Sequence, residues 1–270
     1  MRHPPLSNSG AAFDALAANY DVEAVNHLVS RWIREIVWER LGRLFPPGST
    51  VLEIGCGTGE DALFLARQGV HVVATDAAPM MLEQTAQKAQ DAGLNHLIET
   101  RQLDLTDAAV WALPTGGFDG VHSNYGVLNC IGEWSPLAKC LTRAVRPGGR
   151  MGFAVMGRFC LIETVWSIRH RQFDQAQRRW SGRSTATIGG VTFPVYYPSP
   201  KRLSRAFREA GFRQRHLLGL GVCLPPSDLY VGLAKRPRLG AWLRRMESIL
   251  APLPVFRTLG DHYWIEFTRC

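Results

Sequence analysis

Residues 51–61 hold the chain's most informative combination of side chains and turns. Their sequence, Val-Leu-Glu-Ile-Gly-Cys-Gly-Thr-Gly-Glu-Asp, predicts a buried strand, a glycine turn and the start of a helix. Closely spaced glycines let a backbone turn approach a ligand with no side chain between them, and the amides at a helix start then face that ligand. The sequence therefore predicts a cofactor site at this turn.

Two classes of cofactor are bound by such turns, and an acidic residue separates them. Gly55 and Gly57 fit the dinucleotide pattern G-x-G-x-x-G/A, but Glu60 stands where its third small residue belongs. An acidic helix start suits a pyrophosphate badly and suits a ligand with a positive centre and an amino group. With Glu53 the segment follows E-x-G-x-G-x-G, which resembles motif I of the class I S-adenosylmethionine-dependent methyltransferases.

A second acid ends the next apolar run, residues 70–76, and follows the first glycine of the turn by 21 residues. This spacing predicts that Asp76 binds ribose hydroxyls, since a carboxylate can accept two hydrogen bonds from a diol. Asp76 would also cap the helix that follows, and both roles are compatible. The resemblance adds Ala77 to the cofactor-binding residues and implies that Met81 packs near the adenine.

Two later strand ends complete the expected cofactor site. The resemblance implies that Asp104 accepts a hydrogen bond from the adenine amino group and that the backbone amide of Leu105 binds a ring nitrogen. A solvated loop is the alternative for Asp104. Asn124 follows a predicted strand over residues 118–123, at the exit where the reactive methyl group should point.

The segment after Asn124 bears on the methyl acceptor. Residues 123–129 lack the N/D-P-P-Y/F motif with which methyltransferases of base amines grip a flipped base, although Tyr125 alone could stack on a ring. The segment resembles the N-F/Y-G-x-L-N form of small-molecule methyltransferases. Tyr125 and Asn129 are therefore the substrate-side candidates, with packing roles as the alternative.

The N-terminal residues 12–21 carry one more resemblance. They are similar to the F-D-x-x-A-x-x-Y-D entry of small-molecule methyltransferases, which include the quinone-methylating group. The resemblance implies that Tyr20 lies over the methionine end of the cofactor. Arg31 could pair with the cofactor carboxylate, and a surface cation is the alternative for it.

Strands and helices must alternate to position these residues, and the sequence alternates through residue 156. This favours an α/β fold with a doubly wound, mostly parallel seven-stranded sheet of the Rossmann-like methyltransferase type, whose last strand the resemblance makes antiparallel. Helices are expected over residues 22–44, 61–68, 79–92, 136–145, 200–210 and 239–250, and late strands over 213–221 and 262–268.

Insertions interrupt the alternation in the second half. We expect residues 1–156 to form the N-terminal helices and the cofactor-binding core, and residues 199–221 and 261–270 to return to that core. Two insertions, over residues 157–198 and 222–260, are expected to form a cap.

Charge divides the chain in the same place. Residues 1–150 carry 12 Arg and Lys against 16 Asp and Glu, a net charge of −4, while residues 151–270 carry 19 against 7, a net charge of +12. A basic cap over a methyl donor could attract an acidic substrate, and it could equally hold nucleic acid. An Arg-rich solvated surface is the alternative.

The cysteines and histidines indicate the cellular compartment and argue against a metal site. The six cysteines form no C-x-x-C pair, and the chain opens with no signal peptide and holds no apolar run of membrane-spanning length, so a cytoplasmic protein with reduced thiols is expected. The scattered histidines show no ligand spacing, so no metal site is expected.

The sequence thus predicts an enzyme that transfers a methyl group from S-adenosylmethionine to a small molecule and releases S-adenosylhomocysteine. The acceptor atom could be O, N or C, on a molecule that is acidic, amphipathic or aromatic, and no general base can be named. Three alternatives stay open: an RNA or protein methyltransferase that uses the basic half, a nicotinamide-dependent oxidoreductase, and a non-enzymatic cofactor-binding module.

Overall fold

A seven-stranded sheet forms the centre of the molecule. The computed structural model describes residues 6–25, 27–225, 233 and 235–270 of the chain. The strands of this sheet are β1 (Thr50–Ile54), β2 (His71–Asp76), β3 (Ile98–Gln102), β4 (Phe118–Ser123), β5 (Val145–Met156), β8 (Phe212–Leu220) and β9 (His262–Arg269).

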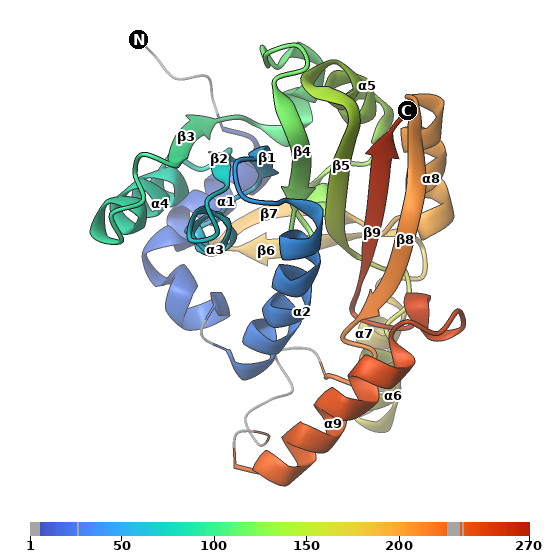
Figure 1. Cartoon of the computed structure of the whole chain (residues 1–270). Helices are drawn as coiled ribbons and strands as arrows, with labels where there is room; N and C mark the ends of the chain where they lie inside the picture. The colour runs from blue at the N-terminus through green and yellow to red at the C-terminus, as the bar shows by residue number, and fades with distance from the viewer. Residues whose placement is uncertain (1–5, 26, 226–232, 234) are drawn as a thin grey trace.

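The strand order is β3-β2-β1-β4-β5-β9-β8, and β9 alone runs antiparallel to its neighbours (Figure 1). β1 lies parallel between β2 and β4, with Leu52 paired to Val73 on one side and Val121 on the other. The strand order therefore reverses at β1, and the carboxyl end of such a switch point is where open α/β sheets bind ligands. The expected fold class is confirmed.

Helices cover both faces of the sheet. The helices on one face pack with Trp264 and Phe45, and those on the other pack with Phe153 and Phe267. Those on the first face are α2 (Leu28–Leu44), α3 (Glu60–Ala66) and α4 (Pro79–Asp91), and those on the second are α5 (Ser135–Ala144) and α8 (Pro200–Glu209). No helix in the described part of the chain combines the length and the apolar character that a membrane span needs.

The first long helix is shorter than the sequence predicts. α2 begins at Leu28 rather than Val22, because His27 takes an extended conformation (φ −63°, ψ 132°) and a π-helical turn spans Asp21–Val25 before it. The chain before this turn forms α1 (Asn8–Leu16) and a 3₁₀ turn over Ala17–Asn19.

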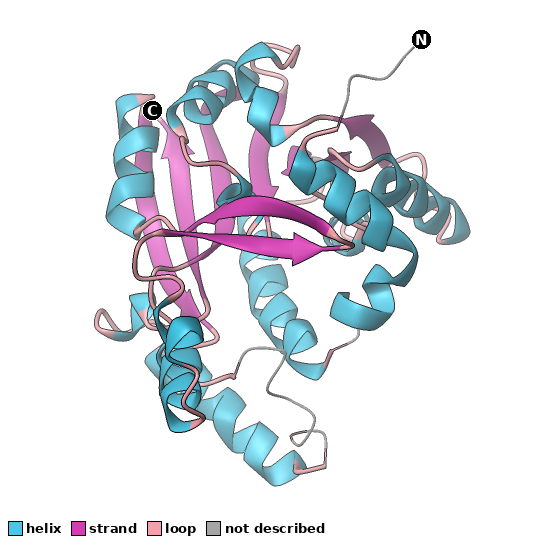
Figure 2. Cartoon of the chain, turned by 180° about the vertical axis from the view of Figure 1, so that it is seen from behind, coloured by secondary structure: helices cyan, strands magenta, loops and turns pink. Residues whose placement is uncertain are grey.

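The second half of the chain adds elements outside the sheet. A hairpin of β6 (Arg183–Ile188) and β7 (Val191–Tyr196) turns through Gly189 and Gly190, both at positive φ. It packs on α1 (Figure 2). At this contact Phe193 meets Phe13 with ring centroids 6.0 Å apart. The other additions are α6 (Leu161–Arg169), α7 (Phe173–Gln177), α9 (Pro237–Leu250) and a 3₁₀ turn over Phe256–Thr258. In the first half of the chain, 3₁₀ turns follow β3 (Leu105–Val110) and β4 (Val127–Cys130).

Candidate functional site

The turn after β1 requires glycine at three positions. Gly55, Gly57 and Gly59 have φ of 71°, 53° and 87°, a region that side chains rarely adopt. A Cβ on Gly55 would lie 2.4 Å from the Cγ2 of Val127, and one on Gly59 would lie 2.8 Å from the Cγ2 of Thr85. The turn is thus held between two neighbouring elements, and Gly57 is left facing the space in front of it.

That space is a cavity of about 960 Å³, its open mouth included, at the carboxyl ends of β1, β2 and β4. Nine residues predicted to bind the cofactor line it, together with the substrate-side candidate Tyr125; the nine are Tyr20, Gly55, Gly57, Asp76, Ala77, Met81, Asp104, Leu105 and Asn124. Their role toward a ligand stays a prediction.

Asp76 joins the end of β2 to the glycine turn. Its Oδ2 accepts a hydrogen bond from the Gly57 amide at 2.9 Å, and its Oδ1 accepts one from the Ala78 amide at 3.0 Å. Burial raises the pKa of Asp76, and these amides only partly oppose that shift. Each carboxylate oxygen keeps a second lone pair for a ligand hydroxyl.

Asp104 lies beyond the end of β3 and caps the 3₁₀ turn that follows. Its Oδ1 accepts hydrogen bonds from the Thr106 amide at 2.8 Å and the Thr106 hydroxyl at 2.7 Å. Burial alone would raise the pKa of Asp104, but the hydrogen bonds from Ser7 and Thr106 outweigh it and the net shift is downward. Leu105 and Met81 supply buried apolar wall at this end, which suits a flat ring with a polar edge.

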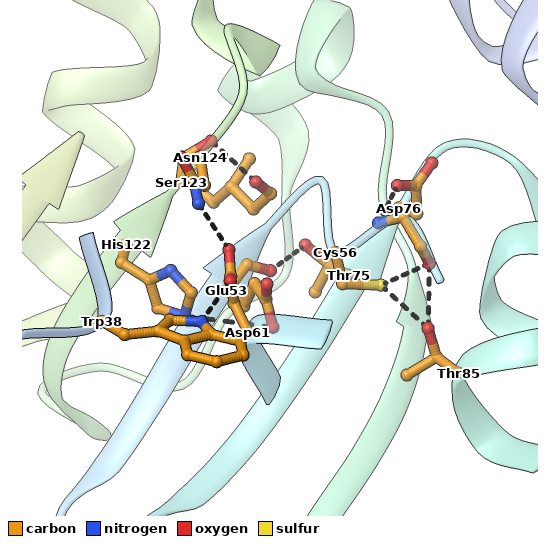
Figure 3. A network of polar contacts seen from close by, with 12 residues as sticks. Trp38, Glu53, Cys56, Asp61, Thr75, Asp76, Thr85, His122, Ser123 and Asn124 are labelled. Carbon is orange, nitrogen blue, oxygen red and sulfur yellow. Dashed lines mark hydrogen bonds and ion pairs between the residues drawn. The ribbon is translucent and has the colours of Figure 1, made fainter. Parts of the chain in front are cut away.

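A buried hydrogen-bond network supports the other end, after β4 (Figure 3). Asn124 donates from Nδ2 to Asp61 Oδ2 at 2.8 Å, and Trp38 donates from Nε1 to Asp61 Oδ1 at 2.7 Å. Tyr125 follows with a φ of 51°, and its hydroxyl donates to the Ser30 carbonyl. Burial raises the pKa of Tyr125, so its hydroxyl stays protonated.

Arg34 is the cation that faces this end, and sequence reasoning missed it. Its Nη1 lies 3.5 Å from Asp61 Oδ1, its Cζ lies 4.6 Å from the Tyr125 ring centroid, and its buried Nε has no partner among the described residues. The predicted cation, Arg31, is exposed and is not among the described cavity-lining residues. Arg34 shares the buried face of α2 with Val37 and Leu41. An arginine that falls on the apolar face of a predicted helix was the feature of the sequence that could have identified it.

Glu53 does not reach the cavity wall, although its motif position predicted a cofactor role. Its side chain lies beneath the glycine turn, 2% exposed, with Oε2 3.9 Å from Nε2 of His122 (Figure 3). Burial first, and then the nearby charge of Asp61, raise its pKa well above the usual range. Glu53 therefore lies one layer behind the site.

Asn129 is also held away from the cavity. Its Nδ2 donates to the Met156 carbonyl at 3.0 Å and to the Tyr196 carbonyl at 2.5 Å, and its Oδ1 accepts from the Met156 amide at 2.9 Å. The fully buried side chain joins β5 to β7, so the structure gives it the packing role that the sequence left as the alternative.

Comparisons with known proteins agree with this geometry. A family model described as a methyltransferase domain matches residues 25–217. The chain is 29% identical over 250 residues to a demethylmenaquinone methyltransferase of Symbiobacterium thermophilum, covering 83% of the chain and 91% of that relative. It is 32% identical over 239 residues to a malonyl-acyl-carrier-protein O-methyltransferase of Pseudescherichia vulneris, covering 88% and 86%.

The fold also matches solved structures. The crystal structure of the cyclase SpnF superposes with a TM-score of 0.64 at 16% sequence identity, over 98% of this chain and 97% of that one. At this identity the likeness concerns the fold alone.

Proposed function

Because the chain belongs to the class I S-adenosylmethionine-dependent methyltransferases, we propose that the cavity at the glycine turn holds this cofactor with the adenine at Asp104 and the methyl group near Asn124. The protein transfers a methyl group from S-adenosylmethionine to a small-molecule acceptor. The comparisons lend no support to the oxidoreductase, the RNA or protein methyltransferase, or the non-enzymatic module.

One observation supports the placement above all: loops from successive strand ends meet around a single cavity. Asp104 and Leu105 offer an acceptor and an amide for an adenine edge, and Asp76 offers lone pairs for ribose hydroxyls. At the far end the buried Nε of Arg34 lies beside the cavity with no hydrogen-bond partner in the described part of the chain, which fits a carboxylate. The residues present therefore fit the whole cofactor.

Bound S-adenosylmethionine supplies an activated sulfonium methyl group, so the protein's own task is to align the acceptor and to exclude water. Asn124 and Tyr125 bound the methyl end of the cavity, and the bonds to Asp61 and Ser30 fix both side chains before the acceptor arrives. Such preorganisation saves the cost of ordering these groups during the reaction.

We propose that the acceptor carries a nucleophile that ionises by itself, such as a carboxylate, an enolate or a phenolate. Among the described residues that line the cavity there is no histidine, and Tyr125 is held protonated. Asp61 already accepts hydrogen bonds at both oxygens. One relative is named for an acceptor of this kind, a malonyl group, which bears a carboxylate.

Calorimetry with S-adenosylhomocysteine tests the cofactor placement. Asp76→Ala and Arg34→Ala should each weaken binding about 10- to 100-fold, since each removes charge-assisted hydrogen bonds. Arg31→Ala is the matched control for Arg34→Ala and should bind as the unchanged protein does. Equal losses at Arg31 and Arg34, or unchanged binding by Asp76→Ala, would contradict the placement.

Transfer of a labelled methyl group to a panel of acceptors tests the acceptor class. Carboxylic acids, phenols and acidic carbon acids should be methylated, with kcat/KM rising with pH as the acceptor itself ionises. Methylation confined to amines would contradict the proposal, and the cofactor placement would survive that result.

We further propose that the enzyme works in the cytoplasm. The six cysteines are all free in the structure. Five of them are buried or half-buried thiols whose pKa is raised first by burial, namely Cys56, Cys130, Cys140, Cys160 and Cys223. Unpaired thiols fit a reducing compartment. Recovery of the protein from an oxidising compartment after cell fractionation would contradict this.

A further inference from the structure

The solvent-facing side of α9 is apolar and basic, where a surface helix is ordinarily polar. Trp242 is 57% exposed and Ile249 is 50% exposed, and Leu239 is exposed beside them. Arg238 and Arg245 lie on the same face, since positions 238, 242, 245 and 249 follow the three- and four-residue spacing of one helix face. We call this set the α9 face.

The other side of α9 fixes the helix to the core, so the α9 face is turned outward. Gly240 packs against the Trp32 ring of α2, and the Arg244 side chain lies over that ring and pairs with Glu35 at 2.5 Å. The buried carboxylate of Glu247 accepts hydrogen bonds from two backbone amides in the loop after β8.

Acidic side chains are missing from the surface of this segment. Between residues 235 and 260 the only acid is Glu247, and it is 1% exposed. Lys235, Arg236, Arg238 and Arg245 are all exposed, and none of them forms an ion pair with a described residue. The α9 face is therefore a cationic surface with large apolar side chains set in it.

A second patch of exposed apolar and basic side chains, with the exposed Asp174 among them, lies at the same end of the molecule. On α6 and α7, Val165, Ile168 and Phe173 are 57%, 48% and 56% exposed, with Arg169 and Arg171 beside them. Figure 1 and Figure 2 both place α6, α7 and α9 beyond the end of the sheet toward which β4 points. This is the end at which the cofactor cavity lies.

We propose that this end of the protein docks on an anionic lipid surface through the α9 face and the α6–α7 patch. A helix that lies in a membrane interface carries Trp and aliphatic side chains to insert and Arg or Lys to meet lipid phosphates. An acidic protein partner would match the arginines, but several separate protruding aliphatic and aromatic side chains match a fluid apolar layer better than a preformed surface.

Docking would bring the cavity to the membrane. On the proposed function, an acceptor with a long apolar part could then pass from the lipid to the methyl end without crossing water. The binding itself does not depend on that function, because it concerns residues outside the cavity.

Flotation of the full chain with lipid vesicles tests the proposal. The protein should float with vesicles of phosphatidylcholine and phosphatidylglycerol at low salt, and should be released by 0.5 M salt or by pure phosphatidylcholine. The double variant Arg238→Ala/Arg245→Ala should lower the partition coefficient about 30-fold, and Trp242→Ala about 10-fold.

Matched controls lie on other elements. Lys139→Ala on α5 and Met80→Ala on α4 remove an exposed cation and an exposed apolar side chain and should leave flotation unchanged. Binding of S-adenosylhomocysteine, measured on the same samples, shows that the variants are folded and reports separately on the proposed function. Equal losses in the controls, no flotation at low salt, binding to an acidic protein without lipid, or a self-association that Trp242→Ala abolishes would each overturn the proposal.

Discussion

Two clusters of buried ionisable side chains lie near the carboxyl end of the parallel strands. They differ in whether an arginine forms an ion pair with the buried carboxyl groups. Beneath the glycine turn, Glu53 lies beside His122 at 3.9 Å, and its Oε2 has no hydrogen-bond partner among the described residues. Beneath the α6–α7 insertion, Arg179 contacts Glu163 at 2.5 Å and Asp261 at 2.6 Å.

The difference sets the charge of each carboxyl. Burial raises the pKa of Glu53, and the more distant Arg34 does not restore it. Burial would do the same to Asp261, but Arg179 and His262 outweigh it and hold the pKa of Asp261 far below its usual range. The ionised form of Glu53 behind the cofactor turn is therefore disfavoured. In the other cluster, ion pairs of Arg179 with Glu163 and Asp261 connect α6 to the residue before β9.

Removal of the shared cation should give the largest effect. Arg179→Met removes the buried cation that Glu163 and Asp261 share, and leaves them only Arg178 and His262 as partners. It should lower the free energy of unfolding by about 3–5 kcal/mol in urea denaturation. Arg178→Met is the control, because Arg178 contacts Glu163 from a half-exposed position and should cost about 1 kcal/mol or less. Similar losses in the two variants would contradict the comparison.

The second largest effect is expected from low pH, which should change the stability of the protein through the cluster behind the glycine turn. Burial lowers the pKa of His122 to about 4 from 6.5, so the unfolded chain binds this proton first as the pH falls. The free energy of unfolding should therefore decrease between pH 6.5 and pH 4, by about 3 kcal/mol from this group. His122→Leu should show a shallower decrease over that range, and an unchanged slope would mean that His122 is charged in the folded protein.

The smallest effect is expected at Glu53. A folded-state pKa raised above the unfolded value gives a stabilising contribution at low pH that is lost as the pH rises. Glu53→Gln replaces an acid whose ionised form is disfavoured by burial with a neutral group of the same shape. It should change the free energy of unfolding at pH 7 by less than about 1 kcal/mol. Asp261→Asn is the matched variant, and it should be clearly destabilising because Arg179 loses a charged partner.

More of the cofactor-facing side of the site than of the rest could be predicted from the sequence. Gly55 and Asp76 could be predicted from their local spacing at strand ends, which can be read from the sequence. Asp104 was predicted from the resemblance to the methyltransferase family. Arg31 was predicted and Arg34 was missed, because both lie on one predicted helix and only packing against the sheet decides which side chain is turned inward.

Other parts depended on contacts between distant residues. Asn129 matches a family pattern, yet its side-chain amide donates a hydrogen bond to the carbonyl of Tyr196, which lies 67 positions later in the chain. The hairpin of β6 and β7 was left as unassigned insertion, although Gly189 and Gly190 mark its turn. The α9 face could not be predicted as exposed, because the helix period alone does not say which side meets α2.

The direction of β9 has a practical consequence. This strand starts at the end of the sheet where the cavity lies, the carboxyl end of the parallel strands, and it finishes at the opposite end, where Cys270 follows it (Figure 1). Of the six cysteines, Cys270 alone is exposed, and the others are buried or half-buried. A maleimide dye or a surface tether should therefore attach at this one thiol, and the cavity and the α9 face would be left free for ligand and vesicle measurements.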